Sequence, residues 1–249
     1  MTQADAKGPV LILAARSDIG NAIAHRFAAA GHPIQLAARG AEGMEAMRAD
    51  LALRHQVEVS VHALDALDIE AHEAFLDTLP ALPEIAVCAV GLLGDQAASA
   101  ADAGAATKVM RSNFEAPALL LGALANRFEA RGSGVIVGLS SVAGDRGRAT
   151  NYVYGAAKAG FTAFLSGLRN RLAPSGVHVV TVLPGFVNTQ MTEGMDLPAR
   201  LTAEPEEVAL AVERAVTRRQ NVIYVRRIWW LVMMIIRNIP EPLFKRMKI

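Results

Sequence analysis

The chain has 249 residues, 20% of them charged, and a formal net charge of +1, so its charge gives no indication of a nucleic-acid partner. Hydrophobic residues make up 52% of the sequence, which suits one large globular domain with a buried core and excludes a disordered chain. The single cysteine, Cys88, has no second cysteine to pair with, as is typical of proteins in a reducing compartment.

No segment of the sequence indicates secretion or membrane insertion. The first ten residues, MTQADAKGPV, lack the basic start and apolar run of a secretory signal. The longest apolar run, residues 228–236, is much shorter than the roughly 20 residues that a spanning helix needs. We therefore expect a soluble cytoplasmic protein, or one that lies on the cytoplasmic face of a membrane.

Short apolar runs alternate with longer helical patterns along the chain. The apolar runs predict strands over residues 10–15, 34–39, 57–65, 84–90, 133–140, 176–185 and 221–225. Helices are predicted over 19–31, 42–54, 105–130, 151–173 and 204–218. This alternation predicts an α/β fold, in which one doubly wound domain over 1–225 contains a parallel sheet of about seven strands with helices on both faces. Residues 226–249 form a basic amphipathic extension, either part of that domain or interfacial.

The turn after the first strand reads AARSDIG. A dinucleotide-binding fold lays the pyrophosphate here, against backbone N–H groups at a helix N-terminus, and glycines let the backbone approach it. Gly20 is the one glycine left of the usual G-x-x-x-G-x-G spacing, with Ala14 and Asp18 in the other places. Ala14 suits this turn only if its φ stays negative. The alternative is an ordinary turn in which Ser17 or Asp18 caps the helix.

Two arginines bear on which dinucleotide would bind. An acidic residue at the end of the second strand favours NAD, whereas an arginine accommodates the 2′-phosphate of NADP. Here Arg39 ends that strand and Arg16 lies in the turn, so NADP(H) is favoured over NAD(H), although both also suit solvated surface charges. Asp65, at the end of the third strand, either accepts a hydrogen bond from the adenine amino group or caps the next helix.

The stretch LSSVAGDRGRATNYVYGAAKAG, from residue 139, contains candidate acid–base chemistry. Tyr154 and Lys158 are four residues apart on a predicted helix and share a face, whereas Tyr152 faces elsewhere. A neighbouring ammonium lowers the pKa of a phenol, and a serine at the end of the preceding strand could bind the substrate oxygen. The alternative is a core tyrosine beside a surface lysine, a common helical spacing.

These motifs occur in an order that resembles the short-chain dehydrogenase/reductase (SDR) family along nearly the whole chain. The resemblance is carried by AARSDIG, by Asn113 in RSNFEAP, and by SSVAG, YGAAK and LPGFVNT. It implies that Asn113, Ser141, Tyr154 and Lys158 are catalytic, with Ser140 as a strand-side neighbour, and that no metal is used. With the first turn and its neighbours, the candidate cofactor-binding residues are Ala14, Arg16, Ser17, Asp18, Ile19, Gly20, Arg39, Asp65, Gly91, Tyr154, Lys158, Pro184, Gly185, Val187 and Thr189.

The resemblance implies hydride transfer between a nicotinamide cofactor and a carbonyl substrate. In reduction of a ketone, Tyr154 would protonate the forming alkoxide and Ser141 would bind the same oxygen. Lys158 would lower the tyrosine pKa and hold the nicotinamide ribose, while Asn113 would steady a water that links the lysine to solvent. Two alternatives remain: an alcohol dehydrogenase for a small soluble substrate, and a silent nucleotide-binding sensor or scaffold. Ala14, and Cys88 in the CAVG that replaces the family's N-N-A-G, point towards the silent protein.

Two C-terminal segments bear on the substrate. After Thr189 the family usually builds a lid, which Met191, Met195 and Leu197 would line, although an ordinary surface loop is an alternative. In the extension, Arg226–Ile249, basic residues bracket an apolar run with two tryptophans, which suits the headgroup region of an anionic membrane. Other interpretations are a helix packed on a partner subunit or across the substrate cleft.

A narrower resemblance concerns the same extension. The tail is similar to the ending of SDR reductases that act on polyprenyl-phosphate-linked keto-sugars, such as decaprenylphosphoryl-2-keto-pentose reductases, and SDIG and AVG fit that branch. It implies a lipid-linked carbonyl substrate. Family resemblance also implies a homodimer or homotetramer that pairs through the helices predicted at 105–130 and 151–173.

Overall fold

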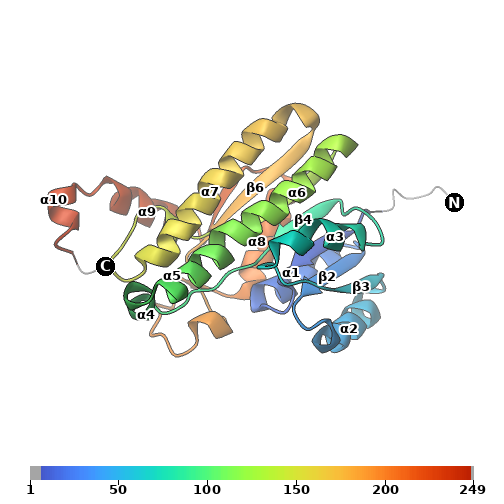
Figure 1. Ribbon diagram of the computed structural model, residues 1–249, viewed down its shortest axis with the longest axis horizontal. Helices are drawn as coiled ribbons and strands as arrows, with labels where there is room; N and C mark the ends of the chain where they lie inside the picture. The colour runs from blue at the N-terminus through green and yellow to red at the C-terminus, as the bar shows by residue number, and fades with distance from the viewer. Residues whose placement is uncertain (1–6, 248–249) are drawn as a thin grey trace.

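The computed structural model describes residues 7–247, and its centre is a parallel seven-stranded sheet (Figure 1). The strand order is β3-β2-β1-β4-β5-β6-β9, which confirms the predicted doubly wound α/β fold. The strands are β1 (Val10–Leu13), β2 (Ile34–Ala38), β3 (Val59–Ala63), β4 (Ile85–Cys88), β5 (Gly134–Leu139), β6 (Val177–Pro184) and β9 (Val222–Val225). Each begins or ends a few residues inside the predicted apolar run.

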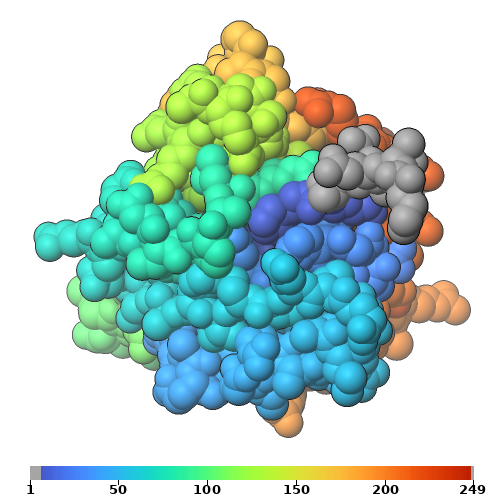
Figure 2. Space-filling view, turned by 90° about the vertical axis from the view of Figure 1, so that its right-hand side faces the viewer, coloured from blue at the N-terminus to red at the C-terminus, as the bar shows by residue number. Residues whose placement is uncertain are grey.

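The helices cover both faces of the sheet because strand residues alternate between two cores. Val10 and Ile12 of β1 pack towards α1 (Asp18–Ala29) and α8 (Pro205–Thr217). Leu11 and Leu13 pack towards α6 (Ala116–Arg131) and α7 (Tyr152–Leu172), which run side by side in Figure 1. Two further helices are α2 (Glu45–His55) and α3 (His72–Asp77). In the view of Figure 2 the first half of the chain, blue to green, forms most of the surface.

The helix predicted over 105–130 is interrupted in the structure. It consists of α5 (Ala103–Met110), a π-helical turn over Arg111–Glu115, and α6. Pro117 has no N–H to donate to the carbonyl of Asn113, and its ring crowds that carbonyl, so a regular α-helix is disfavoured here. The wider turn carries Asn113, which is fully buried. Such turns occur often at functional sites.

Two small additions lie near the carboxyl ends of the strands. The first is α4 (Gln96–Ala101), whose N-cap Asp95 accepts a hydrogen bond from the backbone N–H of Ala98. The second is a two-stranded sheet of β7 (Phe186–Val187) and β8 (Thr202–Ala203). The main sheet reverses its strand order between β1 and β4, and doubly wound folds bind ligands in the crevice at such a point.

The C-terminal extension forms α9 (Ile228–Asn238) and α10 (Glu241–Phe244), which project from one end of the molecule (Figure 1). Trp229 and Met233 of α9 are buried. Arg146, from the loop before α7, donates to the carbonyls of Ile236 and Ile239, each at 2.6 Å. Lys248 and Ile249 of the predicted extension lie outside the described residues, as do residues 1–6. Among the helices of residues 7–247, none is long and apolar enough to cross a membrane.

Candidate functional site

Helix α7 places Tyr154 and Lys158 at the carboxyl end of the sheet. The backbone N–H of Gly155 donates to the backbone carbonyl of Asn151 (2.7 Å), and that of Val153 donates to Gln96 Oε1 (3.1 Å), which fixes the first turn of the helix. Tyr154 lines a cavity, whereas Tyr152, two residues earlier, is 47% exposed and does not. Lys158 is buried, and its Nζ donates to the carbonyl of Leu139 at the end of β5 (2.9 Å).

Two glycines bring Ser141 next to Tyr154. Ser141 caps a short 3₁₀ turn, Val142–Gly144, through its Oγ, which accepts from the N–H of Ala143 (3.1 Å). A Cβ on Gly144 would lie 2.7 Å from the backbone nitrogen of Ala159, and a Cβ on Gly155 would lie 2.8 Å from the carbonyl oxygen of Ala143. Only glycine permits this approach of the turn to α7, which places Ser141 and Tyr154 on the wall of one cavity.

The neighbouring serine, Ser140, points away from this pair. Its hydroxyl donates to the carbonyl of Lys158 (2.9 Å) and contacts the hydroxyl of Thr162 (2.6 Å). Both serines border the cavity, but the hydroxyl of Ser140 is used to tie the end of β5 to α7.

Asn113 lies behind the Tyr154–Lys158 pair. Its Nδ2 donates to the carbonyls of Leu92 (2.6 Å) and Val109 (2.8 Å), and its Oδ1 accepts from the N–H of Leu92 (3.2 Å). A Cβ on Gly91 would lie 3.0 Å from Asn113 Oδ1 and 3.5 Å from Lys158 Nζ. The absence of a side chain at Gly91 thus leaves the amide and the ammonium beside one another.

The pKa of Tyr154 moves opposite to the sequence-based expectation. Burial raises the pKa of the phenol to about 12, although the hydrogen bond with Ser141 opposes this change. Lys158 Nζ lies 5.8 Å from the centre of the Tyr154 ring and donates to Leu139, so its charge does not offset the burial of the phenol. Burial also lowers the pKa of Lys158 to about 8.

The turn between β1 and α1 corrects a second expectation. Ala14 has φ +66°, not the negative φ that the sequence analysis requires of it. The turn demands this left-handed backbone at the place where the family pattern has glycine, and alanine occupies it at a cost of about 1–2 kcal/mol. Ser17 is the N-cap of α1, since its Oγ accepts from the N–H of Gly20 (3.1 Å). Asp18 Oδ2 accepts instead from the N–H of Gln190 (2.8 Å), in the segment after β7.

The two candidate 2′-phosphate ligands lie together at the carboxyl ends of β1 and β2. Arg16 and Arg39 are both exposed, and Arg16 Nη1 donates to the carbonyl of Arg39 (3.3 Å). A Cβ on Gly40 would lie 3.1 Å from Arg16 Nη1. Asp65 closes a turn by accepting from the N–H of Leu67 (3.0 Å).

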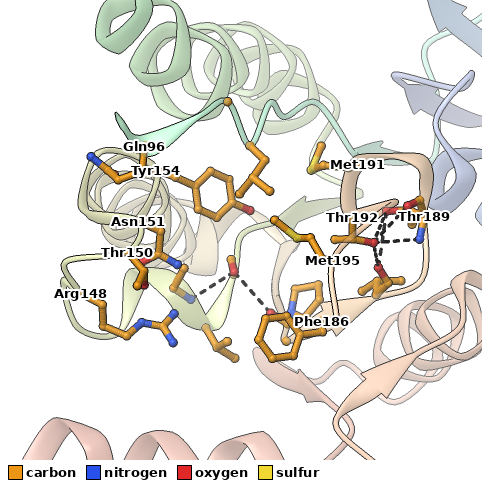
Figure 3. Close-up of a pocket in the computed structure, with 18 of the residues that line it drawn as sticks. Gln96, Arg148, Thr150, Asn151, Tyr154, Phe186, Thr189, Met191, Thr192 and Met195 are labelled. Carbon is orange, nitrogen blue, oxygen red and sulfur yellow. Dashed lines mark hydrogen bonds between the residues drawn. The ribbon is translucent and has the colours of Figure 1, made fainter. Parts of the chain in front are cut away.

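A cavity of about 440 Å³ lies beside Tyr154 and is lined mainly by residues from the later part of the chain (Figure 3). The sequence-predicted residues that line it are Ile19, Ser141, Tyr154, Pro184, Gly185, Val187 and Thr189. Of the predicted lid residues, Met191 and Met195 line the cavity and Leu197 does not. Arg16, Arg39 and Asp65 belong instead to the ends of β1–β3. The predicted residues therefore follow one edge of the sheet, from β3 to β6.

Several further lining residues were not predicted from the sequence, among them Trp229, Gln96, Arg148 and Asn151. Trp229 of α9 packs so closely on Gly185 that a Cβ there would lie 1.9 Å from the indole, and its Nε1 donates to the carbonyl of Leu201 (3.0 Å). For Arg148 and Asn151, the sequence signal was the polar stretch DRGRATN directly before YVYGAAK, because polar residues that precede a helix with catalytic residues often face the same site. For Trp229 the signal was the buried stripe of α9, residues 229, 232, 233 and 236.

These residues suit a nicotinamide dinucleotide. The N-terminus of α1 faces the crevice, and a Cβ on Gly20 would lie 2.5 Å from the carbonyl oxygen of Ala14, so the turn keeps its tight, backbone-lined form. Two exposed guanidinium groups, those of Arg16 and Arg39, lie at the ends of β1 and β2. Thr189 and Pro184 border the cavity close to Tyr154, where a nicotinamide ring would be positioned against a substrate.

The family model for short chain dehydrogenases matches residues 9–198. An uncharacterized oxidoreductase of Mycobacterium tuberculosis is 39% identical over 242 residues, 96% of each chain. Among solved structures, a short-chain dehydrogenase from Sphingobium yanoikuyae in complex with NADPH is 28% identical, with a TM-score of 0.80 over 94% of this chain and 97% of that one. A bulky-bulky ketone specific alcohol dehydrogenase from Comamonas testosteroni is 27% identical, with a TM-score of 0.79 over 97% and 95%. The chain belongs to the short-chain dehydrogenase/reductase family of NAD(P)-dependent oxidoreductases.

Proposed function

We propose that the protein is an NADP(H)-dependent reductase that converts a ketone to a secondary alcohol, with Asn113, Ser141, Tyr154 and Lys158 as its catalytic residues. The observation that carries the proposal is the position of Ser141 and Tyr154 on the wall of one cavity, backed by the buried Lys158, whose Nζ donates to the carbonyl of Leu139. A silent scaffold has no need to keep this ammonium in the interior.

The protonation state of Tyr154 is compatible with the reductive direction. A phenol with a pKa of about 12 is protonated at neutral pH, so it starts the reaction as a proton donor. When bound, the nicotinamide group supplies the hydride. Tyr154 gives its proton to the oxygen of the forming alkoxide, and Ser141 donates a hydrogen bond to that same oxygen. Lys158 holds the nicotinamide ribose, and Asn113 steadies the water through which the proton on Tyr154 is replaced.

The positive charge at the carboxyl ends of β1 and β2 supports NADP(H) over NAD(H). Arg16 and Arg39 are exposed, lie together, and form no ion pair within 4.0 Å among residues 7–247. Ser17, Ile19 and Gly20 would hold the pyrophosphate, and Asp65 the adenine. The similar Sphingobium enzyme is a complex with NADPH, which favours the same choice.

The test is a titration with NADPH and NADH, followed by nicotinamide fluorescence, in the wild type and in Arg39→Ala and Arg16→Ala. We expect NADPH to bind more tightly, and each variant to weaken NADPH more than NADH. Ketone reduction is then measured by loss of NADPH. If the wild type binds neither cofactor, the reductase is excluded and the silent scaffold takes its place.

We further propose a lipid-linked carbonyl substrate, such as a keto-sugar, and contact between α9–α10 and the cytoplasmic face of an anionic membrane. Apolar side chains on the outer side of α9 are 41–57% exposed: Ile228, Trp230, Leu231, Met234 and Ile235. Exposed cations flank them: Arg227, Arg237, Lys245 and Arg246. Apolar and cationic groups arranged in this way suit an interfacial helix. Trp229 of the same helix lines the cavity, so a membrane-bound substrate would have a short path to the site.

We also propose that the chain is a homodimer or homotetramer paired through α5, α6 and α7. Met110, Phe114, Leu119 and Tyr152 are apolar or aromatic side chains on or beside these helices, and each is 40–47% exposed. Covering them in a subunit interface would remove this surface from water. Light scattering of the purified protein gives the subunit number.

A further inference from the structure

One wall of the cavity carries buried polar atoms without partners. They are Gln96 Nε2, Arg148 Nε and Asn151 Oδ1, and none has a hydrogen-bond partner among the described residues. All three residues line the cavity that contains Tyr154. Buried polar atoms are nearly always paired, because an unpaired one destabilises the fold. Three on one wall indicate a surface arranged for a polar ligand.

Hydrogen bonds tie Gln96 and Asn151 to the first turn of α7. Gln96 Oε1 accepts from the N–H of Val153, so its amide nitrogen is the end left for the cavity. The carbonyl of Asn151 accepts from the N–H of Gly155 at the start of α7, which anchors the residue to the helix that carries Tyr154. Gln96 comes from α4 and the other two from the loop before α7, so two separate segments converge on one wall.

Arg148 brings a positive charge to this wall. No carboxylate lies within 4.0 Å of its guanidinium among residues 7–247. The nearest acid that acts on it is Asp145, whose carboxylate is occupied by the hydroxyl of Tyr224 (2.9 Å). Burial lowers the pKa of Arg148, in keeping with a cation that lacks a full counter-charge. A partly buried guanidinium of this kind is stabilised by an anion that pairs with it.

The opposite wall is mainly apolar, and the hydroxyl of Thr192 on that side is hydrogen-bonded to the carbonyls of Val187 and Thr189. Figure 3 shows Gln96, Arg148 and Asn151 on one side of Tyr154, with Met191, Met195 and Phe186 on the other. Trp229 closes the apolar side by packing edge-to-face on Phe186, with ring centres 5.3 Å apart. A substrate whose carbonyl reaches Tyr154 would therefore meet polar groups on one flank and apolar groups on the other.

We propose that Gln96, Arg148 and Asn151 form a polar subsite that binds an anionic, hydroxyl-bearing group of the substrate. Arg148 and Gln96 donate to its anionic oxygens, and Asn151 accepts from its hydroxyl. The rest of the substrate lies along Met191 and Met195. This inference rests on the proposed function, since it names the substrate class of the same site: a ketone that carries a carboxylate or phosphate on one flank and an apolar portion on the other.

The first experiment compares substrates that differ only in the anionic group. One pair is a hydroxylated keto acid and its methyl ester, and the other is a keto-alcohol phosphate and its dephosphorylated form. Wild type, Arg148→Met and Arg148→Lys are assayed with NADPH, with Arg218→Met as the control because Arg218 is an exposed arginine on the distant end of α8. The pair that shows the larger preference identifies the anion as carboxylate or phosphate.

In the wild type we expect kcat/KM to be about tenfold higher or more for the anionic member of one pair, mainly through KM. Arg148→Met should abolish this preference while changing the neutral member less than about twofold. Arg148→Lys should keep part of the preference because it keeps the charge. Gln96→Glu retains an oxygen for the N–H of Val153 but adds a negative charge, so it should weaken the anionic member alone. Arg218→Met should match the wild type.

The subsite is overturned if the wild type reduces both members of each pair equally, or if Arg148→Met slows both equally. In either case ketone turnover itself upholds the proposed function. If no ketone is reduced, the proposed function fails, and thermal unfolding with the keto acid and the phosphate alone decides on the subsite. Stabilisation of the wild type but not of Arg148→Met supports it, and equal shifts in the two proteins exclude it.

Discussion

Tyr154 and Tyr152 are two residues apart on α7, but Tyr154 lines the cavity and Tyr152 is 47% exposed on the helix surface. We expect Tyr154→Phe to lower kcat for ketone reduction by about 10²–10⁴-fold, because it removes the proton donor, and to leave NADPH affinity within a few-fold. Tyr152→Phe is the matched control and should leave kcat unchanged. The measurement is steady-state kinetics together with the NADPH titration. Equal activity of wild type and Tyr154→Phe would contradict the assignment.

Lys158 gives the activity and the stability opposite pH dependences. Burial lowers its pKa from the ordinary 10.5 to about 8 in the folded chain, so it loses its charge as pH rises through about 8. We expect kcat/KM for reduction to fall above this pH. Between about 8 and 10.5 the unfolded chain binds more protons at this residue than the folded chain, so the contribution of Lys158 to the free energy of unfolding rises with pH.

The measurement for Lys158 is chemical denaturation across this pH window, in the wild type and in Lys158→Met. The variant should lack the rise in the free energy of unfolding that belongs to this residue, and it should be less active at every pH. If the free energy of unfolding rises with pH by the same amount in Lys158→Met as in the wild type, another group causes the rise.

At the residue scale, the sequence was sufficient to predict which side chains lie together where reactive residue types occur at a regular spacing. The four-residue spacing predicted that Tyr154 and Lys158 share a face of one helix, and the family resemblance selected Ser141. The structure brings Ser141 and Tyr154 to one cavity, while their catalytic roles stay predictions. Arg148 and Trp229 were not predicted, because a loop and a tail have no periodicity that says where a side chain points. The positive φ of Ala14 could not be predicted either, because alanine strongly disfavours it and the sequence shows only the residue type.

The turn between β1 and α1 yields a prediction at the scale of an element. Ala14 has φ +66°, a conformation that glycine adopts freely, so Ala14→Gly should raise the free energy of unfolding by about 1 kcal/mol. In a chain of this length that corresponds to about 2–4 °C in Tm. Ala22→Gly, inside α1, is the matched control and should lower the free energy of unfolding by about 0.5–1 kcal/mol. Thermal unfolding of the three proteins is the measurement, and a lower Tm for Ala14→Gly would contradict the reading of this turn.

The helix over 105–130 shows what an apolar pattern omits at the same scale. Hydrophobic periodicity continues across 111–115, so the pattern predicts one helix, whereas the structure has a π-helical turn there. The cause is Pro117, whose missing N–H and bulky ring disturb the turn before it. The sequence contained this signal, but its consequence, the inward position of Asn113, depends on packing against the segment after β4.

At the scale of the whole molecule, the doubly wound sheet was predictable because each buried strand is a continuous apolar run. The position of the extension was not, because a short amphipathic helix packs equally well on its own domain, on a partner or on a membrane. In the structure the two sides of α9 have different surroundings. Its inner side, with Trp229 and Met233, completes the core and the cavity, while its outer side remains exposed.

Because one side of α9 is buried and the other is exposed, contact with a membrane has to be tested on the exposed side alone. Deleting residues 226–249 would remove Trp229 from the cavity and damage the site, so point changes on the outer side are needed. We expect the wild type to co-sediment with phosphatidylglycerol vesicles at low salt, and Trp230→Glu with Ile235→Glu to stay in the supernatant, because the two carboxylates oppose insertion and repel the anionic headgroups. Added salt should weaken wild-type binding, since the flanking arginines are exposed. Leu53→Glu, at a 75% exposed position on α2, is the control and should bind like the wild type. If the wild type fails to sediment at low salt, the membrane is excluded, and the same double variant in light scattering then shows whether a second copy of the chain covers α9.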